Sequence, residues 1–246
     1  MGSNLRHKEI LSFLEKNGSV SIRELTRALY VSEATVRRDL TELEKAGALR
    51  RTFGGAEPIT GGTKQVPLFI REALDSRAKS EICRVAAALV KEGDTLFIDG
   101  SSTAQYLVKY IASVRDIVVV TYSIKTAALM CENHIKTYCV GGLMLENSLV
   151  CVGNKAVSFA RGFNTDIAFV SCKGVSDEGK FTDTSEEETA VRRTFMENAK
   201  TRVMLMTGNK FGKSYLHTLA EAKEIDYLFS DAPVPEAITA KLKASS

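Results

Sequence analysis

The clearest periodic pattern in the chain lies at residues 33–46. Apolar Val36, Leu40 and Leu43 recur there at helical spacing, Ser32 offers an N-cap oxygen, and a glycine follows where a helix would end. This pattern predicts an amphipathic helix with one buried face and one free face. Cations and hydroxyls border the free face, so a solvated surface helix is the simplest interpretation of this stretch alone.

Two further amphipathic segments precede this helix. Residues 5–16 carry apolar side chains at helical spacing and end at an Asn-Gly pair, while Ser21 and Glu24 form a capping-box pattern that starts a second helix. Only two residues separate the end of that second helix from Ser32, so the chain must turn sharply there. The arrangement predicts a helix-turn-helix whose third helix enters the major groove of DNA.

The free side of the third helix offers chemistry suited to DNA. Hydroxyl and guanidinium groups bind phosphates or guanine edges, and the first exposed residues of the helix lie where base edges would pass. After the helix, an extended arm with two arginines ends at a Gly-Gly turn, which predicts a β-wing, although a solvated loop is the alternative. The predicted DNA-binding residues are Ser32, Glu33, Ala34, Thr35, Arg37, Arg38, Arg50 and Arg51.

Length and composition are those of a globular protein with room for two domains. The 246 residues are 44% hydrophobic and 26% charged, and the net charge of +3 does not by itself indicate nucleic acid. Five cysteines without a CxxC pair predict reduced, buried thiols, and three scattered histidines lack ligand spacing, so no metal site is expected. Neither a leader pattern nor a membrane-spanning run is visible, which favours a cytoplasmic protein.

A polar stretch containing proline and glycine pairs divides the chain. We expect a winged helix-turn-helix domain at residues 1–57, a linker at 58–74 and a larger domain at 75–246. In the larger domain, short apolar runs alternate with amphipathic segments, which predicts an α/β fold with a mainly parallel sheet covered on both faces. Strands are expected at 95–98, 117–121, 136–140, 167–171, 202–206 and 227–230, and helices at 82–90, 104–112, 123–131 and 186–199.

Ligands of such sheets bind beyond the C-terminal ends of the strands, where small, hydroxylated and cationic residues gather in this chain. Residues 99–103 predict a phosphate cradle at the start of a helix, although an ordinary Ser/Thr-capped helix is the alternative. The two lysines after later strands are either counterions for an anionic ligand or solvated loop residues. The predicted effector-binding residues are Asp99, Gly100, Ser101, Ser102, Thr103, Tyr122, Gly141, Gly142, Lys173 and Lys210.

Both parts of the chain resemble the DeoR family of bacterial transcription regulators. The resemblance is carried by VSEATVRRDLTELEKAGALRR and FGGA in the first part, and by GDTLFIDGSST, VVTYS, a Gly-Gly pair and NKFG in the second. It implies a sensor domain related in fold to ribose-5-phosphate isomerase and CoA transferases. It also implies a sugar-phosphate effector, with residues 99–103 and Lys210 among the residues that bind it.

For the DNA-binding part, the resemblance implies that Thr35, Arg37 and Arg38 contact DNA and that the residues at 33 and 34 vary with operator sequence. A phenylalanine, Phe53, stands where the family usually has a histidine before Gly-Gly-Ala. Three further departures lie in the sensor part: a threonine at 207 for aspartate, a lysine at 173 for an acidic or amide residue, and a tyrosine at 122 for asparagine. The added lysine favours a more anionic effector.

These observations predict a sequence-specific regulator, a repressor of sugar or carbohydrate metabolism genes, that binds double-stranded operator DNA and responds to a phosphorylated sugar. A homodimer or higher homo-oligomer is expected, because two-fold symmetric proteins bind paired half-sites. The alternatives are a sugar-phosphate isomerase-like enzyme fused to a DNA-binding module and an architectural DNA binder without an effector. Catalysis would need a general base, and Asp99 is the only strand-end carboxylate that can be placed in the cleft, without a second acid or base or a histidine there, so no catalytic residue and no cofactor are expected.

Overall fold

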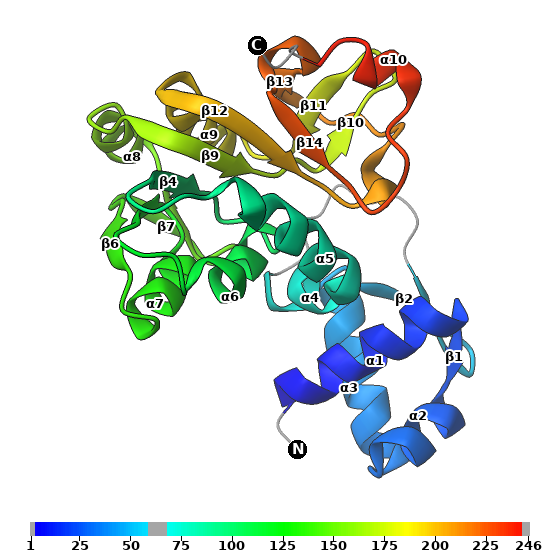
Figure 1. Cartoon of the computed structure of the whole chain (residues 1–246). Coiled ribbons are helices and arrows are strands. Elements are labelled where there is room, and N and C mark those ends of the chain that lie inside the picture. Colours follow the sequence, from blue (N-terminus) through cyan, green and yellow to red (C-terminus); the bar gives the residue numbers. More distant parts are fainter. Residues whose placement is uncertain (1–2, 59–67, 243–246) are drawn as a thin grey trace. The chain divides into compact units, whose positions relative to one another are not determined.

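The computed structural model describes residues 3–58 and 68–242, and the chain divides into two compact units, Met1–Ser76 and Arg77–Ser246 (Figure 1). The N-terminal unit packs helices against a small antiparallel sheet, with Leu25, Val36 and Leu40 fully buried in its core. Its helices are α1 (Ser3–Asn17), α2 (Ile22–Leu29), α3 (Glu33–Lys45) and α4 (Leu68–Ala73). Its strands, in spatial order, are β1 (Val20–Ser21), β3 (Gly55–Pro58) and β2 (Leu49–Thr52).

The connection from α2 to α3 confirms the predicted helix-turn-helix. The Ser21 hydroxyl accepts from the Glu24 amide and the Glu24 carboxylate accepts from the Ser21 amide, so the expected capping box closes the start of α2. Tyr30 turns the chain with a left-handed φ of 52°, and Ser32 Oγ then accepts from the Thr35 amide at the start of α3. Local capping therefore defines where α2 and α3 begin, and the left-handed Tyr30 ends α2.

Two expectations for this unit differ from the structure. The turn of the wing consists of Phe53 and Gly54, while Gly55 already belongs to β3, where a Cβ would lie 1.9 Å from the carbonyl oxygen of Val20. The linker expected at 58–74 is wrong at its C-terminal end, because α4 is helical and buries Ile70 in the core of the N-terminal unit. Residues 59–67 of that linker lie outside the described residues.

The C-terminal unit is built around a six-stranded sheet whose neighbouring strands are all parallel, which confirms the predicted α/β class. Two strands from separate parts of the sequence, β4 and β9, lie beside each other at its centre, and the strand order reverses between them. In spatial order the strands are β14 (Tyr227–Phe229), β12 (Ala199–Leu205), β9 (Thr165–Val170), β4 (Thr95–Ile98), β5 (Val118–Thr121) and β6 (Lys136–Cys139).

Helices cover both faces of this sheet, as Figure 1 shows. On one face Leu96 and Ile98 pack with one set of helices, and on the other Phe97 packs with a second set, as the alternation of side chains along a strand requires. The first set is α5 (Ser76–Ala86), η1 (Ala87–Leu89), η2 (Ala104–Leu107), α6 (Val108–Ile111) and α7 (Ile124–Glu132). The second set is α8 (Asn154–Ala160) and α9 (Glu186–Glu197).

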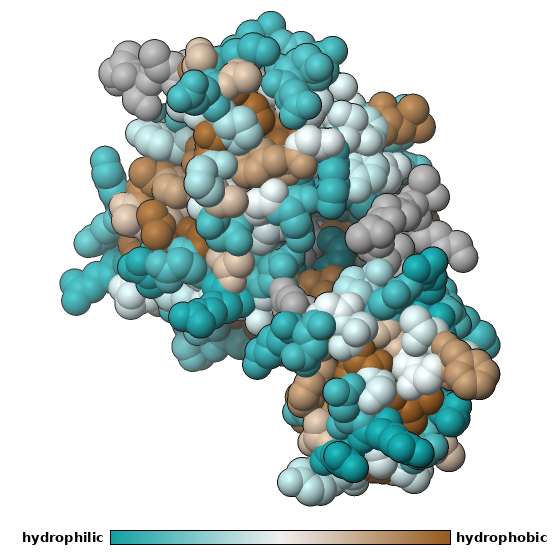
Figure 2. Space-filling view, turned by 90° about the vertical axis from the view of Figure 1, so that its right-hand side faces the viewer, coloured by the Kyte–Doolittle hydropathy of each residue, from teal (hydrophilic) through white to brown (hydrophobic). Residues whose placement is uncertain are grey.

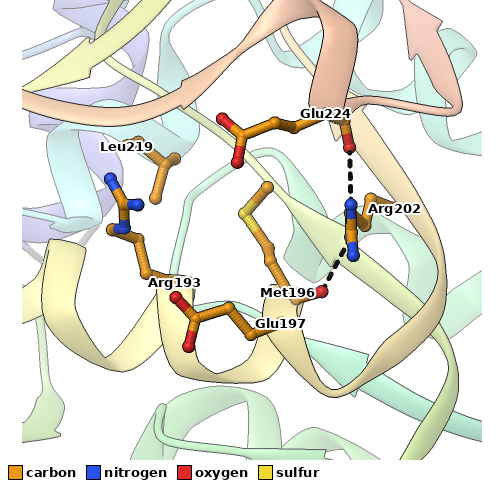
Figure 3. Close-up of a pocket in the computed structure, with 6 residues that line it drawn as sticks. All are labelled: Arg193, Met196, Glu197, Arg202, Leu219 and Glu224. Carbon is orange, nitrogen blue, oxygen red and sulfur yellow. Dashed lines mark hydrogen bonds between the residues drawn. The ribbon is translucent and has the colours of Figure 1, made fainter. Parts of the chain in front are cut away.

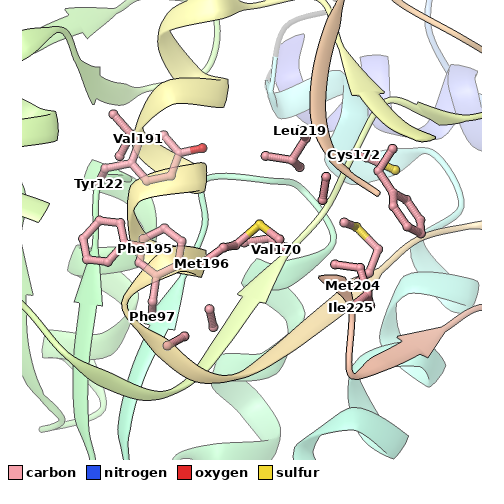
Figure 4. Close-up of a cluster of buried hydrophobic side chains, with 14 of the residues drawn as sticks. Phe97, Tyr122, Val170, Cys172, Val191, Phe195, Met196, Met204, Leu219 and Ile225 are labelled. Atoms are coloured by element: carbon pink, nitrogen blue, oxygen red, sulfur yellow. The ribbon is translucent and has the colours of Figure 1, made fainter. Parts of the chain in front are cut away.

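Aromatic rings form the centre of the second face. The rings of Phe97 and Phe195 stack with centroids 3.8 Å apart, and the Tyr122 ring lies 6.0 Å from Phe97. Figure 4 shows these rings beside Val191 in one buried cluster. The cluster anchors α9 to strand β4, so the residues at the N-terminal end of α9 are held near the C-terminal edge of the sheet.

Several short elements escaped the sequence analysis. A hairpin and a small antiparallel sheet interrupt the α/β alternation, because their strands are only two to five residues long and show no regular period. The hairpin is β7 (Leu143–Leu145) and β8 (Val150–Val152), and the small sheet is β10 (Gly174–Val175), β11 (Lys180–Asp183) and β13 (His217–Glu221). The remaining helices are η3 (Gly208–Lys210), η4 (Ala222–Glu224) and α10 (Glu236–Thr239).

Surface features refine the compositional expectations. All five cysteines are free thiols, but only Cys83, Cys151 and Cys172 are buried, whereas Cys131 and Cys139 are exposed. None of the helices in the described ranges is long and apolar enough to cross a membrane. The view in Figure 2 shows hydrophilic residues around separate hydrophobic groups.

A buried arginine on α9 joins this helix to the small sheet and to the end of β9. Arg192 is 3% exposed and donates from Nη2 to Asp183 Oδ2 at 2.9 Å and from Nη1 to the Ser171 carbonyl at 2.6 Å. Burial acts to lower the pKa of Arg192, but Asp183, together with the other acidic groups around it, outweighs burial and raises that pKa. Burial likewise acts to raise the pKa of Asp183, and Arg192 overcomes this and lowers it. Both groups therefore stay charged inside the unit.

We predict that Arg192→Met lowers the free energy of unfolding by about 3–5 kcal/mol at neutral pH, because it leaves the Asp183 carboxylate, whose side chain is only 14% exposed, without its cation. Urea unfolding of the full chain measures this. The matched control is Arg193→Met, which changes the exposed neighbouring arginine on α9 and should cost less than about 0.5 kcal/mol. Equal stability of the two variants would show that the buried pair contributes nothing.

The pH dependence has a definite sign. Because the folded state lowers the pKa of Asp183, the pair stabilises the fold at neutral pH, and this contribution is lost as the pH falls through the lowered pKa. The stability difference between the native chain and Arg192→Met should therefore shrink on acidification.

Candidate functional site

The face of α3 opposite its buried stripe is open. Arg38 on this face makes no hydrogen bond or ion pair with any residue in the described ranges. Arg37 lies 3.4 Å from the Glu33 carboxylate in an exposed pair one helical turn apart, and the Thr35 hydroxyl is 3.0 Å from that of Ser32. Of the residues predicted for this helix, Ser32, Glu33, Ala34, Arg37 and Arg38 are exposed and Thr35 is half-buried.

The wing is fastened to α3. Arg51 donates from its amide to Glu44 Oε1 and from Nη1 to Thr41 Oγ1, each at 2.9 Å, so its half-buried guanidinium faces the helix. Arg50 remains exposed and pairs with Glu57 across the wing. Of the two arginines that the sequence assigned to DNA, one therefore joins the wing to α3 and the other stays at the surface.

An ion-pair cluster holds α3 on α1. Arg6 donates from Nε to Asp39 Oδ2 at 2.7 Å and from Nη2 to Asp39 Oδ1 at 2.9 Å. Burial acts to raise the pKa of Asp39, but these bonds and the charge of Arg6 lower it. His7 Nε2 lies 3.3 Å from Asp39 Oδ1 and 3.5 Å from Glu42 Oε2, a grouping of metal-ligand types that the sequence did not suggest. Because the guanidinium already occupies both Asp39 oxygens and opposes a cation, we interpret the group as an ion-pair network.

A second cluster lies at the C-terminal ends of β4 and β9, where the strand order reverses. Asp99 follows β4 and is fully buried; its Oδ1 accepts from the Ser101 amide at 2.9 Å and its Oδ2 from the Ser171 amide at 2.8 Å. Burial raises the pKa of Asp99, and the charge of Arg192 opposes that shift. In open α/β sheets the crevice for ligands forms at such a reversal. Because Asp99 is buried, it does not lie at the surface of this candidate site; it holds the Ser101 and Ser171 backbone amides beneath it.

Lys210 reaches the same position from the neighbouring strand. It ends η3 after β12, is half-buried, and donates from Nζ to Ser171 Oγ at 2.9 Å. Ser101 is the half-exposed member of the loop after β4. Thus the ends of three strands contribute an ammonium group, two serines and a buried carboxylate to one place.

The other predicted effector residues are either buried or lie outside the cluster around Asp99, Ser171 and Lys210. Tyr122 is fully buried, and burial raises its pKa far above the ordinary value, so the prediction that this side chain contacts a ligand is wrong for this structure. Lys173 donates to Thr184 Oγ1 at 3.3 Å beside the small sheet. Gly141 and Gly142 follow β6 and are exposed.

The remaining loop residues are packed. A Cβ on Gly100 would lie 2.2 Å from Val150 Cγ1, so the loop approaches β8 more closely than any larger residue permits. Ser102 and Thr103 are 6% and 1% exposed. Most of the expected phosphate cradle is therefore covered, and Ser101 is its accessible part.

Sequence reasoning missed three charged residues of α9 and β11. Arg192 contacts Ser171 directly, Asp183 pairs with Arg192, and Glu188 accepts from Ser148 Oγ at 3.0 Å. A signal for them existed, because Glu188 and Arg192 stand four residues apart on the same stripe as apolar Phe195. Opposite charges at core positions of a helix indicate a buried polar network.

A pocket between α9, β12 and η4 lies apart from this chemistry (Figure 3). Its lining includes Arg202, which donates from Nε to the Met196 carbonyl at 2.8 Å and from Nη1 to the Glu224 carbonyl at 3.3 Å. The first bond adds a side-chain donor to a carbonyl in the last turn of α9, which also accepts from the C-cap amide of Asn198. We therefore assign this pocket a structural role.

Comparisons with known proteins agree across the chain. The DeoR-like helix-turn-helix domain matches residues 6–61, and the DeoR C terminal sensor domain matches residues 74–232. The HTH-type transcriptional repressor GlcR of Bacillus subtilis (strain 168) is 32% identical over 223 residues, which are 90% of this chain and 86% of that protein. The HTH-type transcriptional regulator GolR of Listeria innocua is 29% identical, with 97% and 94% covered.

Among solved structures, ribose 5-phosphate isomerase A from Methanocaldococcus jannaschii matches with a TM-score of 0.42 and 16% identity, covering 56% of this chain and 55% of that one. The relatives that cover nearly the whole chain are transcription regulators rather than enzymes. This chain belongs to the DeoR family and is a DNA-binding transcription regulator with a helix-turn-helix unit followed by a sensor unit.

Proposed function

We propose that this regulator is a repressor of sugar metabolism genes and that a phosphorylated sugar controls it. The observation that carries the proposal is the meeting of Lys210, Ser171 and Asp99 where the strand order of the sheet reverses. Among the relatives, the Escherichia coli (strain K12) glycerol-3-phosphate regulon repressor is 26% identical, covering 97% of this chain and 94% of that protein. Its name pairs repression with a phosphorylated three-carbon compound.

The chemistry of the site suits such a ligand. An ammonium group such as that of Lys210 is a compact point charge that binds phosphate, and the hydroxyls of Ser101 and Ser171 can donate to phosphate or accept from sugar hydroxyls. The half-buried carboxylate of Asp183 can accept from a sugar hydroxyl beside them. The site thus offers one group for the anion and several for the sugar.

Control requires that the ligand bind two states with different affinity. A phosphate competes with Ser171 Oγ for the Lys210 ammonium, and Ser171 is also bonded through its amide to Asp99 and through its carbonyl to Arg192. Occupation of the site therefore alters contacts among three strand ends and α9. We propose that this change favours an arrangement of the protein that binds the operator less tightly.

For the DNA side, we propose that α3 enters the major groove with its N-terminal end. Thr35, Arg37 and Arg38 then contact the phosphate backbone, and Glu33 and Ala34 face base edges. Ser32 and Arg50 border the same surface, while Arg51 acts through its bond to Thr41. A homodimer supplies the second half-site, and the protein acts in the cytoplasm.

We predict that Arg38→Ala weakens operator binding roughly tenfold or more, because it removes a charge-assisted hydrogen bond to DNA. If that bond is to a phosphate, the plot of the logarithm of the association constant against the logarithm of the salt concentration becomes shallower by about 1 in slope. Fluorescence anisotropy at several salt concentrations measures both, with a duplex selected by the native chain from a random library. Lys8→Ala is the control, since Lys8 is an exposed cation on α1, behind the recognition surface. Native affinity for Arg38→Ala would refute the assignment of α3.

We predict that Lys210→Ala keeps operator binding but weakens the effector response about ten- to a hundredfold, because a charged hydrogen bond to the phosphate is lost. A thermal-shift screen of the native chain against a panel of sugar phosphates identifies a stabilising compound, which at 100 times its dissociation constant adds about 2.7 kcal/mol. Titration of that compound against the protein–operator complex then compares Lys210→Ala with Lys213→Ala, an exposed lysine three residues on. Loss of operator binding by folded Lys210→Ala, or an unchanged response, would contradict the assignment.

A further inference from the structure

The tip of the wing carries an apolar side chain with no cover. Phe53 is 108% exposed, the highest value among the exposed large hydrophobic side chains of the described residues. Tyr30, at 93%, is the next, but its hydroxyl can bond to water. Phe53 has no polar group, so water surrounds a full aromatic ring, which is unfavourable until a partner covers it.

The tip is held in place by its own unit. The Gly54 carbonyl accepts from the Ile22 amide at 2.9 Å, at the start of α2, and β3 pairs with β1 through Ser21 and Gly55. Gly55 lies so close to Val20 that no side chain fits there. The backbone on the C-terminal side of Phe53 is therefore fixed, and the ring projects from a rigid support.

The wing also keeps a fixed relation to the recognition helix. Arg51 bonds to Thr41 and Glu44 of α3, and Phe53 lies two residues beyond Arg51, in the turn that follows β2. When α3 occupies the major groove, the wing is thus carried past one phosphate backbone toward the adjacent minor groove, which is about 6 Å wide. Exposed Arg50 on the same strand supplies a cation for the intervening phosphates.

We propose that Phe53 is an apolar wedge that enters the minor groove beside the half-site and selects base steps that open readily. Apolar side chains inserted between base steps in the minor groove unstack and kink DNA, and pyrimidine–purine steps yield most easily. A benzyl group cannot donate a hydrogen bond to a phosphate or a base, so its selection rests on groove shape and deformability. The proposal depends on the proposed docking of α3 in the major groove.

The test compares Phe53→Ala and Phe53→His with the native chain on a duplex that the native chain selects from a random library. Leu216→Ala is the matched control, because Leu216 is an 85% exposed apolar residue of the other unit. Phe53→Ala should keep the native melting temperature, since the ring contacts nothing, and should bind the selected duplex about ten- to a hundredfold more weakly. Phe53→His should also lose affinity, because an imidazole is a poorer wedge.

Substituting inosine for guanine tests whether Phe53 enters the minor groove. Inosine·cytosine pairs lack the guanine amino group of the minor groove, so at the wing-proximal base pairs the native chain should bind inosine·cytosine duplexes more tightly than guanine·cytosine duplexes. Phe53→Ala should lose this discrimination, and Leu216→Ala should keep it. Native affinity and native discrimination in Phe53→Ala would overturn the proposal. So would a changed oligomeric state of Phe53→Ala in sedimentation, which would assign the ring to a protein contact.

Failure of the broader assignment has a different signature. If the native chain enriches no sequence from the library, the proposed docking of α3 fails. If the native chain enriches a sequence that Phe53→Ala binds equally well, only the wedge is refuted.

Discussion

The C-terminal unit depends on keeping one guanidinium charged inside it. Arg192 is buried, and removing such a charge from water is costly unless acceptors surround it. Asp183 supplies the opposite charge, and the Ser171 carbonyl supplies a second acceptor. These bonds bring together α9, the small sheet and the end of β9, which no local pattern would join. The candidate effector site is built on that junction, since Ser171 also contacts Lys210.

A buried arginine–aspartate pair also stabilises the N-terminal unit, where it holds the recognition helix α3 against α1. Buried Asp39 lies on the core side of α3, and Arg6 from α1 binds both of its oxygens. On the other side, Arg51 joins the wing to Thr41 of α3. The helix is thus fixed from behind and from the wing. A surface that positions side chains against DNA needs such rigidity, because a loosely held contact loses both affinity and selectivity.

Much of the fold was predictable because its signals are local. The capping box of Ser21 and Glu24, the apolar stripe of α3 and the short runs that became β4 and β5 all depend on neighbours within one or two turns. The same reasoning failed at α4, where prolines and glycines upstream favoured a linker. Ile70 is instead fully buried in the core of the N-terminal unit, and this burial outweighs a weak local preference.

By itself, the sequence determined the main helices and strands of both units, the faces that they bury, and that hydroxyl and cationic residues follow the strands of the large sheet. Only the tertiary structure decided which of those residues meet. It placed β9 beside β4, so that Ser171 reaches Asp99, and it buried Tyr122 in the core. The physical reason is that periodicity is a property of neighbours along the chain, whereas strand order brings together residues that are far apart in it, such as Asp99 and Ser171, which are 72 positions apart.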